Sequence, residues 1–467
     1  MALARTLAPQ PSLPAGAAAR MFARRFRGRI VRPDGPGYDA ARGVLERSVD
    51  RRPALIVNPV DARDVADAVR FGRDADLEIA VRSGGHSVAG HSTTDGGLLI
   101  DLAALRGLHI DPAARTAWVG AGLRAGDVTS AAHAHGLAVP FGDTASVGVG
   151  GITLGGGIGW LARKHGLTID SLIAAELVTA DGEVVTVSEE RQPDLFWAIR
   201  GGGGNFGIVT RFQFRLHEVG MVTGGALALP LTADVLTGLV AAAEAAPDEL
   251  TTISLVMPLP PAPFVPPQHH GRPAVVVMPV HVGDPEAGQR AMAPIRALAE
   301  PYADIVGPMP YPAMYQLTAE GSQPHSMALH STFADDLTPT VANELVERML
   351  APEAGPSMLQ LRVLGGAMAR VPANATAFAH RERRLMFMVG RMFDGPDDEA
   401  AAAGWIAGMA NVLRPVANGV YSNFLGDEGE ARIHEAYPDE TYRRLAAIKR
   451  RYDPSNLFRL NQNIRAD

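Results

Sequence analysis

The chain contains no cysteine. This absence excludes disulfide bonds, thiolate metal sites, iron–sulfur clusters and a cysteine nucleophile together. It fits an intracellular protein, and a cytoplasmic location is expected on that ground. No run of about 18 apolar residues occurs, so neither a transmembrane helix nor a membrane partner is expected. Arg24 and Arg25 form a twin-arginine pair, but Phe26 to Arg29 interrupts the apolar stretch of a signal peptide, so a mobile tail followed by a basic segment is expected.

An excess of positive charge is also missing. Lysine and arginine total 43 against 50 aspartates and glutamates, which gives a formal net charge of −7. Binding to nucleic acid needs a basic face, so a nucleic-acid partner is not expected. With 47% hydrophobic and 20% charged residues, the chain is globular. Its 467 residues are too many for one compact core and indicate two domains, or one large domain that carries an insertion.

Glycine, by contrast, is abundant, with 50 residues. One group lies in the segment Arg82-Ser83-Gly84-Gly85-His86-Ser87, between the apolar runs Ile79–Val81 and Leu98–Ile100. These runs predict strands, and the loop between them places one histidine where glycines let main-chain N–H groups approach a ligand closely. A lone histidine in a loop is more often structural than chemical, so both roles remain open for His86 on this evidence.

A second and denser group of glycines runs from Gly142 to Gly159. Glycine at this density costs conformational entropy on folding, so the run needs a reason. It can be a compact turn buried against a helix, or a backbone cradle for an extended cofactor that carries phosphate. Two such runs in one half of the chain favour the cradle.

A third group, Gly202–Gly207, fits the pattern G-x-G-x-x-G of dinucleotide-binding folds. That fold places a strand before the pattern and a helix after it. Here the helical stretch Pro193–Arg200 comes first and the strand Ile208–Leu216 follows, which rejects the dinucleotide fold. A flexible turn and a ligand-facing loop remain equally open for this segment.

The histidines of the first half match no metal-binding pattern. They are not spaced as H-E-x-x-H on a helix, and no carboxylate lies in ligand register with them, so no metal is expected. The pattern G-x-S-x-G is also absent, which disfavours a serine hydrolase. The histidines concerned are His86, His91, His133, His135 and His165.

Strands and helices alternate from residue 221 onwards. Strands are predicted near Met358–Leu364 and Leu385–Met392, and helices near Pro285–Ala299 and Pro339–Leu350. The alternation predicts an α+β domain in which helices cover one face of a sheet. Tyr421–Phe424 is predicted as the end of a further strand.

Short motifs follow one another along the chain in the order Ser83–Ser87, Gly90–Ser92, Gly148–Gly159, Gly201–Val209, Tyr421-x-Asn423 and Tyr452–Ile464. In this order the chain resembles the berberine bridge enzyme-like branch of the vanillyl-alcohol oxidase superfamily of FAD-linked oxidases, and its bacterial members in particular. The resemblance implies an α+β fold with two parts. One is a PCMH-type FAD-binding domain of two subdomains, and the other is a substrate domain with an antiparallel sheet covered by helices.

The resemblance also implies a division of the chain. Residues 1–50, which show no clear period, form an N-terminal segment. Residues 51–219 form the FAD-binding domain and residues 220–415 the substrate-binding domain. Residues 416–467 form a C-terminal segment that returns to the FAD domain.

By the same resemblance, FAD lies extended between the two subdomains, with its pyrophosphate held by the Ser83–Ser87 loop and the later glycines. His86 matches the histidine that bonds covalently to the flavin 8α-methyl carbon, a reaction that a neutral imidazole nitrogen can perform. Tyr421 and Asn423 are the predicted catalytic residues. The residues predicted to bind the cofactor are Arg82, Ser83, Gly84, Gly85, Ser87, His91, Ser92, Gly142, Thr144, Val147, Gly148, Gly151, Gly155, Gly157, Gly159, Gly207, Ile208, Val209, Asn461 and Asn463.

Two departures from the family pattern affect these expectations. Many relatives form a second covalent link through a cysteine where this chain has Thr144, so a single link through His86 is expected. Relatives that oxidise sugars or alkaloids often carry a tyrosine where this chain has Phe424, so another group must accept the substrate proton. The candidates are Tyr421, Tyr311, Tyr315, His165 and Asn423, and for Tyr421 a packing role is equally open.

The resemblance therefore predicts an FAD-dependent oxidase of a small molecule. Hydride passes from a C–H bond next to an alcohol oxygen or amine nitrogen to the flavin, and O2 reoxidises the flavin to give hydrogen peroxide. Val147, at a family position associated with O2 access, favours O2 as the acceptor. Two alternatives remain, which are a dehydrogenase or resistance-type enzyme with another acceptor and a non-catalytic flavin-fold binding protein.

Overall fold

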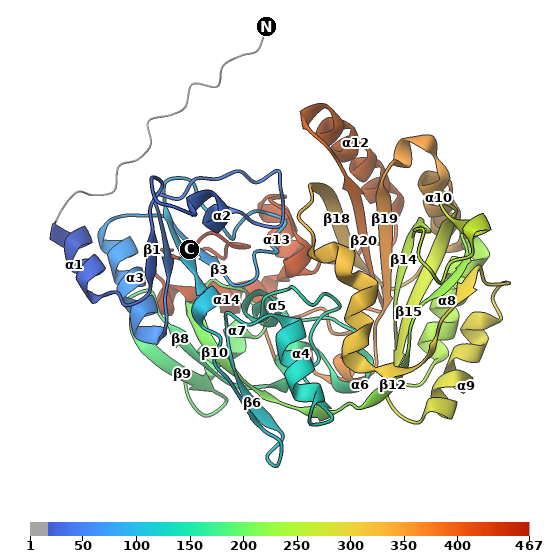
Figure 1. The fold of residues 1–467 in the computed structure, drawn as a ribbon, viewed down its shortest axis with the longest axis horizontal. Coiled ribbons are helices and arrows are strands. Elements are labelled where there is room, and N and C mark those ends of the chain that lie inside the picture. The colour runs from blue at the N-terminus through green and yellow to red at the C-terminus, as the bar shows by residue number, and fades with distance from the viewer. Residues whose placement is uncertain (1–16, 467) are drawn as a thin grey trace, which may run out of the picture.

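The structure is a computed structural model that describes residues 17–466. Two layered halves lie side by side in Figure 1, one built around two smaller sheets and the other around a large sheet. The predicted N-terminal tail falls mostly in residues 1–16, outside the described part. Among the helices of residues 17–466, none has the length and hydrophobicity needed to cross a membrane.

The first sheet has the strand order β1-β2-β4-β3. Strands β2, β4 and β3 run parallel, and β1 joins them antiparallel. The N-terminal segment thus has regular structure despite its lack of a clear period, because its elements are short and packed by aromatic rings such as Phe22, which stacks on Phe71. The elements are α1 (Ala17–Arg25), β1 (Arg29–Val31), α2 (Tyr38–Arg42), β2 (Leu55–Asn58), α3 (Ala62–Asp74), β3 (Ile79–Arg82) and β4 (Leu98–Asp101).

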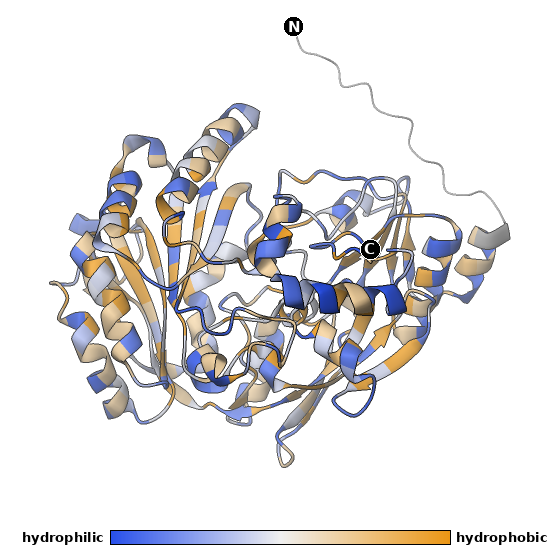
Figure 2. Ribbon diagram, turned by 180° about the vertical axis from the view of Figure 1, so that it is seen from behind, coloured by the Kyte–Doolittle hydropathy of each residue, from blue (hydrophilic) through white to orange (hydrophobic). Residues whose placement is uncertain are grey.

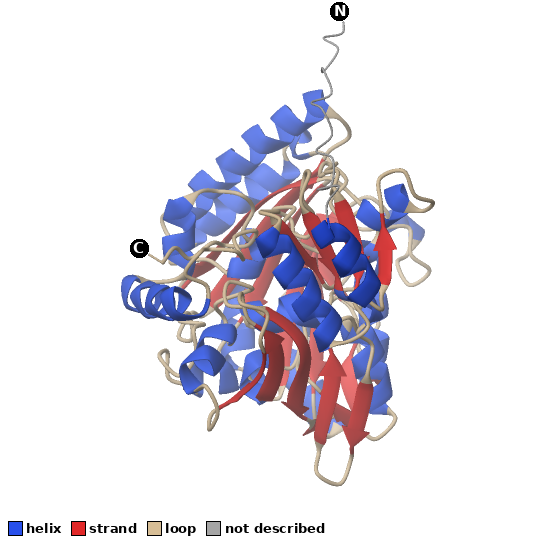
Figure 3. Ribbon diagram, turned by 90° about the vertical axis from the view of Figure 1, so that its left-hand side faces the viewer, coloured by secondary structure: helices blue, strands red, loops and turns tan. Residues whose placement is uncertain are grey.

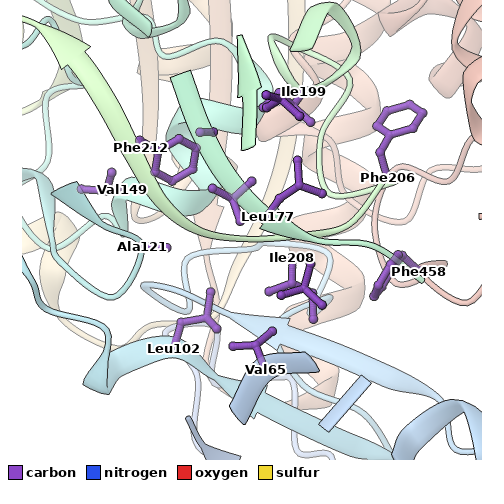
Figure 4. Packing of buried hydrophobic residues seen from close by; sticks show 14 of the residues in the cluster. Val65, Leu102, Ala121, Val149, Leu177, Ile199, Phe206, Ile208, Phe212 and Phe458 are labelled. Atoms are coloured by element: carbon purple, nitrogen blue, oxygen red, sulfur yellow. The ribbon is translucent and has the colours of Figure 1, made fainter. Parts of the chain in front are cut away.

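The second sheet is antiparallel and has the order β5-β6-β10-β8-β9. One hydrophobic core joins it to the first sheet and α3, and Figure 4 shows Val65 and Leu102 on one side of this core and Leu177 and Phe212 on the other. The elements are β5 (Leu108–Asp111), β6 (Thr116–Gly120), α4 (Ala125–His133), β7 (Leu137–Ala138), α5 (Val149–Gly155), α6 (Ala162–His165), β8 (Leu172–Val178), β9 (Val184–Ser188), α7 (Pro193–Ile199), β10 (Ile208–Arg215) and β11 (His217–Glu218).

The large sheet has the main order β16-β13-β15-β14-β19-β20-β18, and all of its pairs are antiparallel. Its helices pack on one face, away from the other half (Figure 1). In Figure 2 its strands are mostly hydrophobic, whereas the covering helices carry hydrophilic residues. The elements are β12 (Met221–Gly224), β13 (Leu227–Pro230), α8 (Ala233–Ala245), β14 (Leu250–Pro258), β15 (Pro273–His281), α9 (Pro285–Arg296), β16 (Ala303–Asp304), β17 (Gly307–Pro310), β18 (Met327–Ala334), α10 (Pro339–Leu350), β19 (Ser357–Val363), α11 (Ala367–Arg370), β20 (Leu385–Met392) and α12 (Pro396–Leu413).

The predicted α+β fold, with an antiparallel sheet covered by helices, is confirmed. Figure 3 shows helices packed beside the strand layers, with the strands at the lower edge of the view uncovered. The prediction of a strand end at Tyr421–Phe424 is wrong, because Ser422–Phe424 forms a turn of 3-10 helix. Its alternation of large and polar residues imitates a strand, but contacts with α5 and β18 set the local conformation.

The C-terminal tail returns to the first half and crosses the Gly202–Gly207 segment, after α13 (Glu430–Ala436) and α14 (Asp439–Tyr452). The amide of Asn205 donates to the carbonyl of Gln462 at 3.1 Å and accepts from the N–H of Ile464 at 3.0 Å. Buried Lys449 donates to the carbonyls of Asn205 and Phe458. The third glycine group therefore binds the C-terminal tail. The sequence left a flexible turn and a ligand-facing loop open for this segment, and neither includes this role.

Candidate functional site

The first two glycine groups meet backbone to backbone. A Cβ atom on Gly84 would lie 2.2 Å from the nitrogen of Gly148, and a Cβ on Gly148 would lie 2.2 Å from the nitrogen of Gly84. Ser83 joins the same two segments, because its Oγ donates to the carbonyl of Ala121 at 2.6 Å and accepts from the N–H of Gly150 at 3.1 Å. Only glycine fits at this contact, so the residue type follows from the close approach of two main chains.

His86 stands beside this contact. Its Nε2 lies 3.0 Å from the Oγ of Ser146, and that hydroxyl donates to the Oγ of Ser322 at 2.8 Å. Burial and the positive charge of Arg124 lower the pKa of His86 to about 4. The imidazole is therefore neutral near pH 7, as a nitrogen nucleophile must be.

The predicted residues of the tail meet His91 at a cavity of about 250 Å³, which Asp427 and Arg459 also line. The side-chain oxygens of Asn461 and Asn463 are buried here, and neither has a hydrogen-bond partner among the described residues. A buried carbonyl oxygen without a donor costs about 1–3 kcal/mol, so a ligand that supplies donors fits this cavity. Burial lowers the pKa of His91 to about 4.

Tyr421 and Asn423 lie together against the end of α5. The hydroxyl oxygen of Tyr421 accepts from the N–H of Gly157 at 2.8 Å and from the side-chain amide of Asn423 at 2.9 Å. Tyr421 is 3% exposed, and burial raises its pKa although both donors lower it. A Cβ on Gly155 would lie 2.1 Å from the Oδ1 of Asn423, so glycine here makes room for the pair.

The remaining predicted residues divide into two groups. Near the glycine contact, Thr144 and Val147 are half-buried in the same stretch as Ser146, and Gly151 is exposed on α5 with open space where a side chain would project. Gly85 has a φ of +75°, which favours glycine. Ser87 accepts a hydrogen bond from the N–H of His91, and Ser92 is buried.

In the second group the side chains serve the fold. The guanidinium of Arg82 binds the carbonyls of Ala41 and Gly43 and the carboxylate of Asp101. Gly159 packs on the main chain of Phe141 and Gly142, and Gly207 packs on β8. The side chains of Ile208 and Val209 belong to the core between the two smaller sheets. For these residues only main-chain atoms are available to a cofactor.

The other candidate proton acceptors do not join Tyr421. Tyr311 and Tyr315 lie in a separate cluster around Trp160, where burial raises the pKa of Tyr311 well above its usual range and that of Tyr315 to about 12. His165 stacks on His217 at 4.3 Å between ring centroids, and burial lowers its pKa to about 3. Of these candidates, Asn423 is the one that lies beside Tyr421.

An ion pair between the two halves was not predicted from the sequence. Arg362 of β19 binds Asp143 at 2.8 Å, donates to the carbonyl of Ile158 at 2.7 Å, and donates to Gln360 at 2.8 Å. Its signal was the polar residues 360 and 362 in an otherwise apolar strand, because alternate residues share one face of a sheet. Ser146 gave no signal apart from its position inside the second glycine group.

The described residues fit FAD on three counts, namely a glycine contact that exposes main chain, buried oxygens without donors, and a neutral histidine. In the same described part, no group of three His, Asp or Glu side chains could hold a metal ion.

The comparisons with known proteins agree. The FAD binding domain family matches residues 53–188, and the berberine and berberine-like family matches residues 420–465. (R)-6-hydroxynicotine oxidase of Paenarthrobacter nicotinovorans is 33% identical over 463 residues, which cover 94% of this chain and 97% of that protein. Xylooligosaccharide oxidase of Thermothelomyces thermophilus is 29% identical, with coverage of 88% and 87%.

Solved structures show the same fold. The crystal structure of 6-hydroxy-D-nicotine oxidase from Arthrobacter nicotinovorans superimposes with a TM-score of 0.83 at 31% identity, over 95% of this chain and 98% of that chain. BBE-like 1 of Physcomitrella patens gives a TM-score of 0.87 at 24% identity, over 97% and 100%. With this identity over nearly its whole length, the chain belongs to the berberine bridge enzyme-like family of FAD-linked oxidoreductases.

Proposed function

We propose that the protein is an oxidase that removes hydride from a C–H bond next to an alcohol oxygen or an amine nitrogen of a small molecule. FAD, when bound, would supply the hydride acceptor and the route by which O2 is reduced to hydrogen peroxide. Two relatives are oxidases by name, one of a hydroxynicotine and one of xylooligosaccharides, and this supports the proposal. Val147 is half-buried and follows Ser146, whose Oγ lies 3.0 Å from Nε2 of His86, and its match to the family position supports O2 as the acceptor.

The geometry at Tyr421 carries the proposal. Its oxygen accepts hydrogen bonds from Gly157 and Asn423, so negative charge that develops there meets two donors already in place. We assign Tyr421 the role of accepting the proton of the substrate hydroxyl or amine, and Asn423 the role of holding the phenol in position. Because burial keeps Tyr421 neutral at rest, its own proton must leave first, and flavin reduction should accelerate as the pH rises.

The face of the large sheet that meets the FAD half supports a substrate with an apolar surface. Residues 359, 361, 387 and 389 pack under the covering helices, and the alternate residues of β19 and β20 point the opposite way. Arg362 on this opposite face reaches Asp143 and the carbonyl of Ile158, which identifies it as the face toward FAD. Rows of side chains cross β14, β19, β20 and β18, which lie next to one another in Figure 1.

One row consists of Met358, Gly390 and Leu329, and the next consists of Leu255, Gln360, Met388 and Ser331. The polar members are already engaged, since Gln360 accepts from Arg362 and Ser331 donates to the carbonyl of Phe424.

The apolar members are half-buried or nearly buried, as expected of a surface that a small molecule completes. A sugar would leave its hydroxyl groups without partners on this face, which costs free energy for each group. Methionine side chains, in contrast, adapt to apolar ligands of varied shape. The substrate that we propose therefore presents a ring or chain of carbon to the sheet and its oxidised alcohol or amine to Tyr421.

The test is anaerobic reduction of the holoenzyme followed by rapid mixing with air-saturated buffer. Benzyl alcohol and benzylamine serve as apolar probes and xylobiose as the polar one. Reduction by an apolar probe and rapid reoxidation with formation of hydrogen peroxide are expected. Slow reoxidation by O2 combined with fast reoxidation by an artificial quinone would replace the oxidase with a dehydrogenase. A flavin that no alcohol or amine reduces would defeat the enzymatic proposal.

We further propose that His86 is the single covalent link to FAD. Acid-precipitated protein should keep its yellow fluorescence on a denaturing gel, and His86→Ala should lose it. Thr144→Cys provides the complementary variant, because it restores the cysteine that relatives use for a second link. Colour that separates from the wild-type protein in acid would refute the covalent link and leave the oxidase proposal standing.

A further inference from the structure

His86 contacts one serine, Ser146, which in turn contacts a second serine, Ser322, from a segment distant in sequence. Ser146 lies in the second glycine group, and Ser322 closes the 3-10 helical segment Tyr311–Ser322 of the large-sheet half. The distances are 3.0 Å from Nε2 of His86 to Oγ of Ser146 and 2.8 Å from that Oγ to Oγ of Ser322. A histidine, a serine and a second serine thus form a continuous chain of hydrogen bonds across the two halves.

The chain of hydrogen bonds favours one position of the imidazole proton. A serine hydroxyl has one proton, and Ser146 donates it to Ser322. Its oxygen is then free to accept from His86, and this arrangement favours the N–H on Nε2. A neutral imidazole has a single N–H, and Nδ1 is therefore left with a free lone pair. The low pKa of His86, about 4, keeps the ring in this neutral state.

We propose that Ser146, oriented by Ser322, is a positioning residue that holds His86 in the tautomer whose Nδ1 forms the bond to the flavin. This inference rests on the covalent link proposed above and assigns the residues that make it possible. In the opposite tautomer Nδ1 would carry the proton and could not act as a nucleophile. The two serines therefore select which nitrogen reacts.

The same serines offer an exit for the proton that the reaction releases. The bond from Nδ1 to the 8α carbon forms, one C–H bond of the 8α methyl group breaks, and the Nε2 proton leaves. Two electrons reduce the flavin, and O2 removes them together with two protons as hydrogen peroxide. Nε2 points at Ser146, so its proton can pass to that oxygen while the hydroxyl proton of Ser146 passes to Ser322.

The test follows covalent attachment rather than turnover. Full-length protein is expressed under riboflavin limitation and incubated in air with FAD. Samples taken over time are acid-denatured, and their covalent flavin is measured by in-gel fluorescence against total protein. The variants are Ser146→Ala, Ser146→Thr and Ser322→Ala, and Ser188→Ala at the surface end of β9 is the matched control. Acid-released FAD, measured in the same samples, reports non-covalent binding.

Ser146→Ala should bind FAD but attach it at least about tenfold more slowly, as expected for loss of one hydrogen bond to the reacting ring. Ser146→Thr keeps the hydroxyl and should attach FAD at the wild-type rate. Ser322→Ala frees the Ser146 hydroxyl to donate to Nε2, which favours the unreactive tautomer, so attachment should slow severalfold even though Ser146 is intact.

Attachment at the wild-type rate in Ser146→Ala would overturn the proposal, and so would a Ser322→Ala variant that matches Ser188→Ala. If Ser146→Ala does not fold, the Ser146→Thr and Ser322→Ala pair decides the question, because both keep an oxygen next to His86. A wild-type protein that never attaches FAD would refute the covalent link itself, an outcome distinct from equal rates among the variants.

Discussion

The two sides of the proposed active site differ in the atoms that they present, which are main-chain atoms on one side and side chains on the other. On the FAD side, the contacts are made by main chain, as at Gly84 and Gly148, where a Cβ on either residue would lie 2.2 Å from a backbone nitrogen. On the side of the large sheet, they are made by side chains such as Met358 and Met388, whose strands pair in regular register.

This difference has a physical consequence. A backbone cradle cannot change its residue types without moving the main chain, so it suits a cofactor that stays the same. A sheet face can exchange every second side chain while its strands remain paired, so it suits substrates that differ between enzymes. The relatives are consistent with this division, since one is named for a hydroxynicotine and another for xylooligosaccharides on one fold.

The largest effect is expected from a methyl group placed in the cradle. Gly148→Ala should abolish FAD loading and lower the melting temperature, because neither backbone nor Ser83 can move away from the new Cβ. Gly404→Ala on α12 is the matched control, because Gly404 is exposed and no described atom lies within 4 Å of the new Cβ. It should leave the apoprotein folded, with a gain of about 0.5–1 kcal/mol from helix propensity. Flavin absorbance per mole of protein measures both, and normal loading of Gly148→Ala would show that the cradle tolerates side chains.

The next effect concerns the phenol that stands at the boundary of the two sides. Tyr421→Phe should slow flavin reduction by about 10²–10⁴-fold, the usual contribution of a positioned acid–base group, with little change in FAD content. In the wild type the rate should rise with pH up to and beyond pH 10, because the pKa of Tyr421 is raised above that value. Stopped-flow reduction from pH 7 to pH 10.5 measures this rise. An unchanged pH profile in Tyr421→Phe would mean that Tyr421 only packs in the site and does not accept the proton.

Asn423→Ala removes one donor to the phenol oxygen. The rise in the rate of flavin reduction should then occur at a higher pH than in the wild type. The direction follows because the hydrogen bond from Asn423 lowers the pKa of Tyr421. Asn423→Asp would remove the donor and add negative charge, and it should shift the profile in the same direction by more.

A third and smaller effect is expected at the ion pair that joins the two sides. Arg362→Leu leaves the buried carboxylate of Asp143 without its cation, and the free energy of unfolding should fall by about 3–5 kcal/mol. Asp143→Asn in the same chain should restore much of the loss, because it removes the uncompensated charge. Urea unfolding of the single and double variants gives the coupling. Simple additivity of the two changes would mean that the pair does not hold the halves together.

The sequence predicted the close contact between main chains better than it predicted the face of the large sheet that meets the FAD half. Glycine is informative when main chains approach closely, so the runs around His86 and from Gly142 to Gly159 indicated the contact that Gly84 and Gly148 make. Residues of β19 and β20 looked like ordinary strand residues, because a face that packs under helices and a face that meets a ligand have the same period of two. Tertiary structure alone separates Leu361, which packs under the helices, from Met358 on the opposite face.

Two segments show the limits of local pattern in this chain, a predicted turn whose packing partner is distant in sequence and a strand that was predicted wrongly. The glycines of Gly202–Gly207 signalled a close approach, but the approaching group was the tail clasped by Asn205, a contact between residues more than 250 positions apart. Tyr421–Phe424 was predicted as a strand because its large and polar residues alternate. This local pattern contains no information about Gly155 of α5, against which the segment packs. Non-local partners determine both segments, and no window of neighbouring residues contains them.

The smallest effect, and the one that most directly probes the substrate side, comes from polarity on the sheet face. Met358→Gln keeps the length of the side chain and adds an amide next to Gly390, where the row has no polar partner for it. Benzyl alcohol should then bind roughly tenfold more weakly, on the order of 1–2 kcal/mol, because the amide must lose water without gaining a hydrogen bond.

The limiting rate of flavin reduction should not change in this variant, since Tyr421 and FAD are untouched, so the effect should appear only in the substrate concentration at half-maximal reduction rate. Met221→Gln on β12, 52% exposed, is the matched control and should behave as the wild type. Binding of xylobiose should be unaffected or improved by Met358→Gln, because an added amide can pair with a hydroxyl. If instead both probes lose affinity equally, the variant has disturbed the sheet as a whole, and the division between a backbone side and a side-chain side would lose its meaning for specificity.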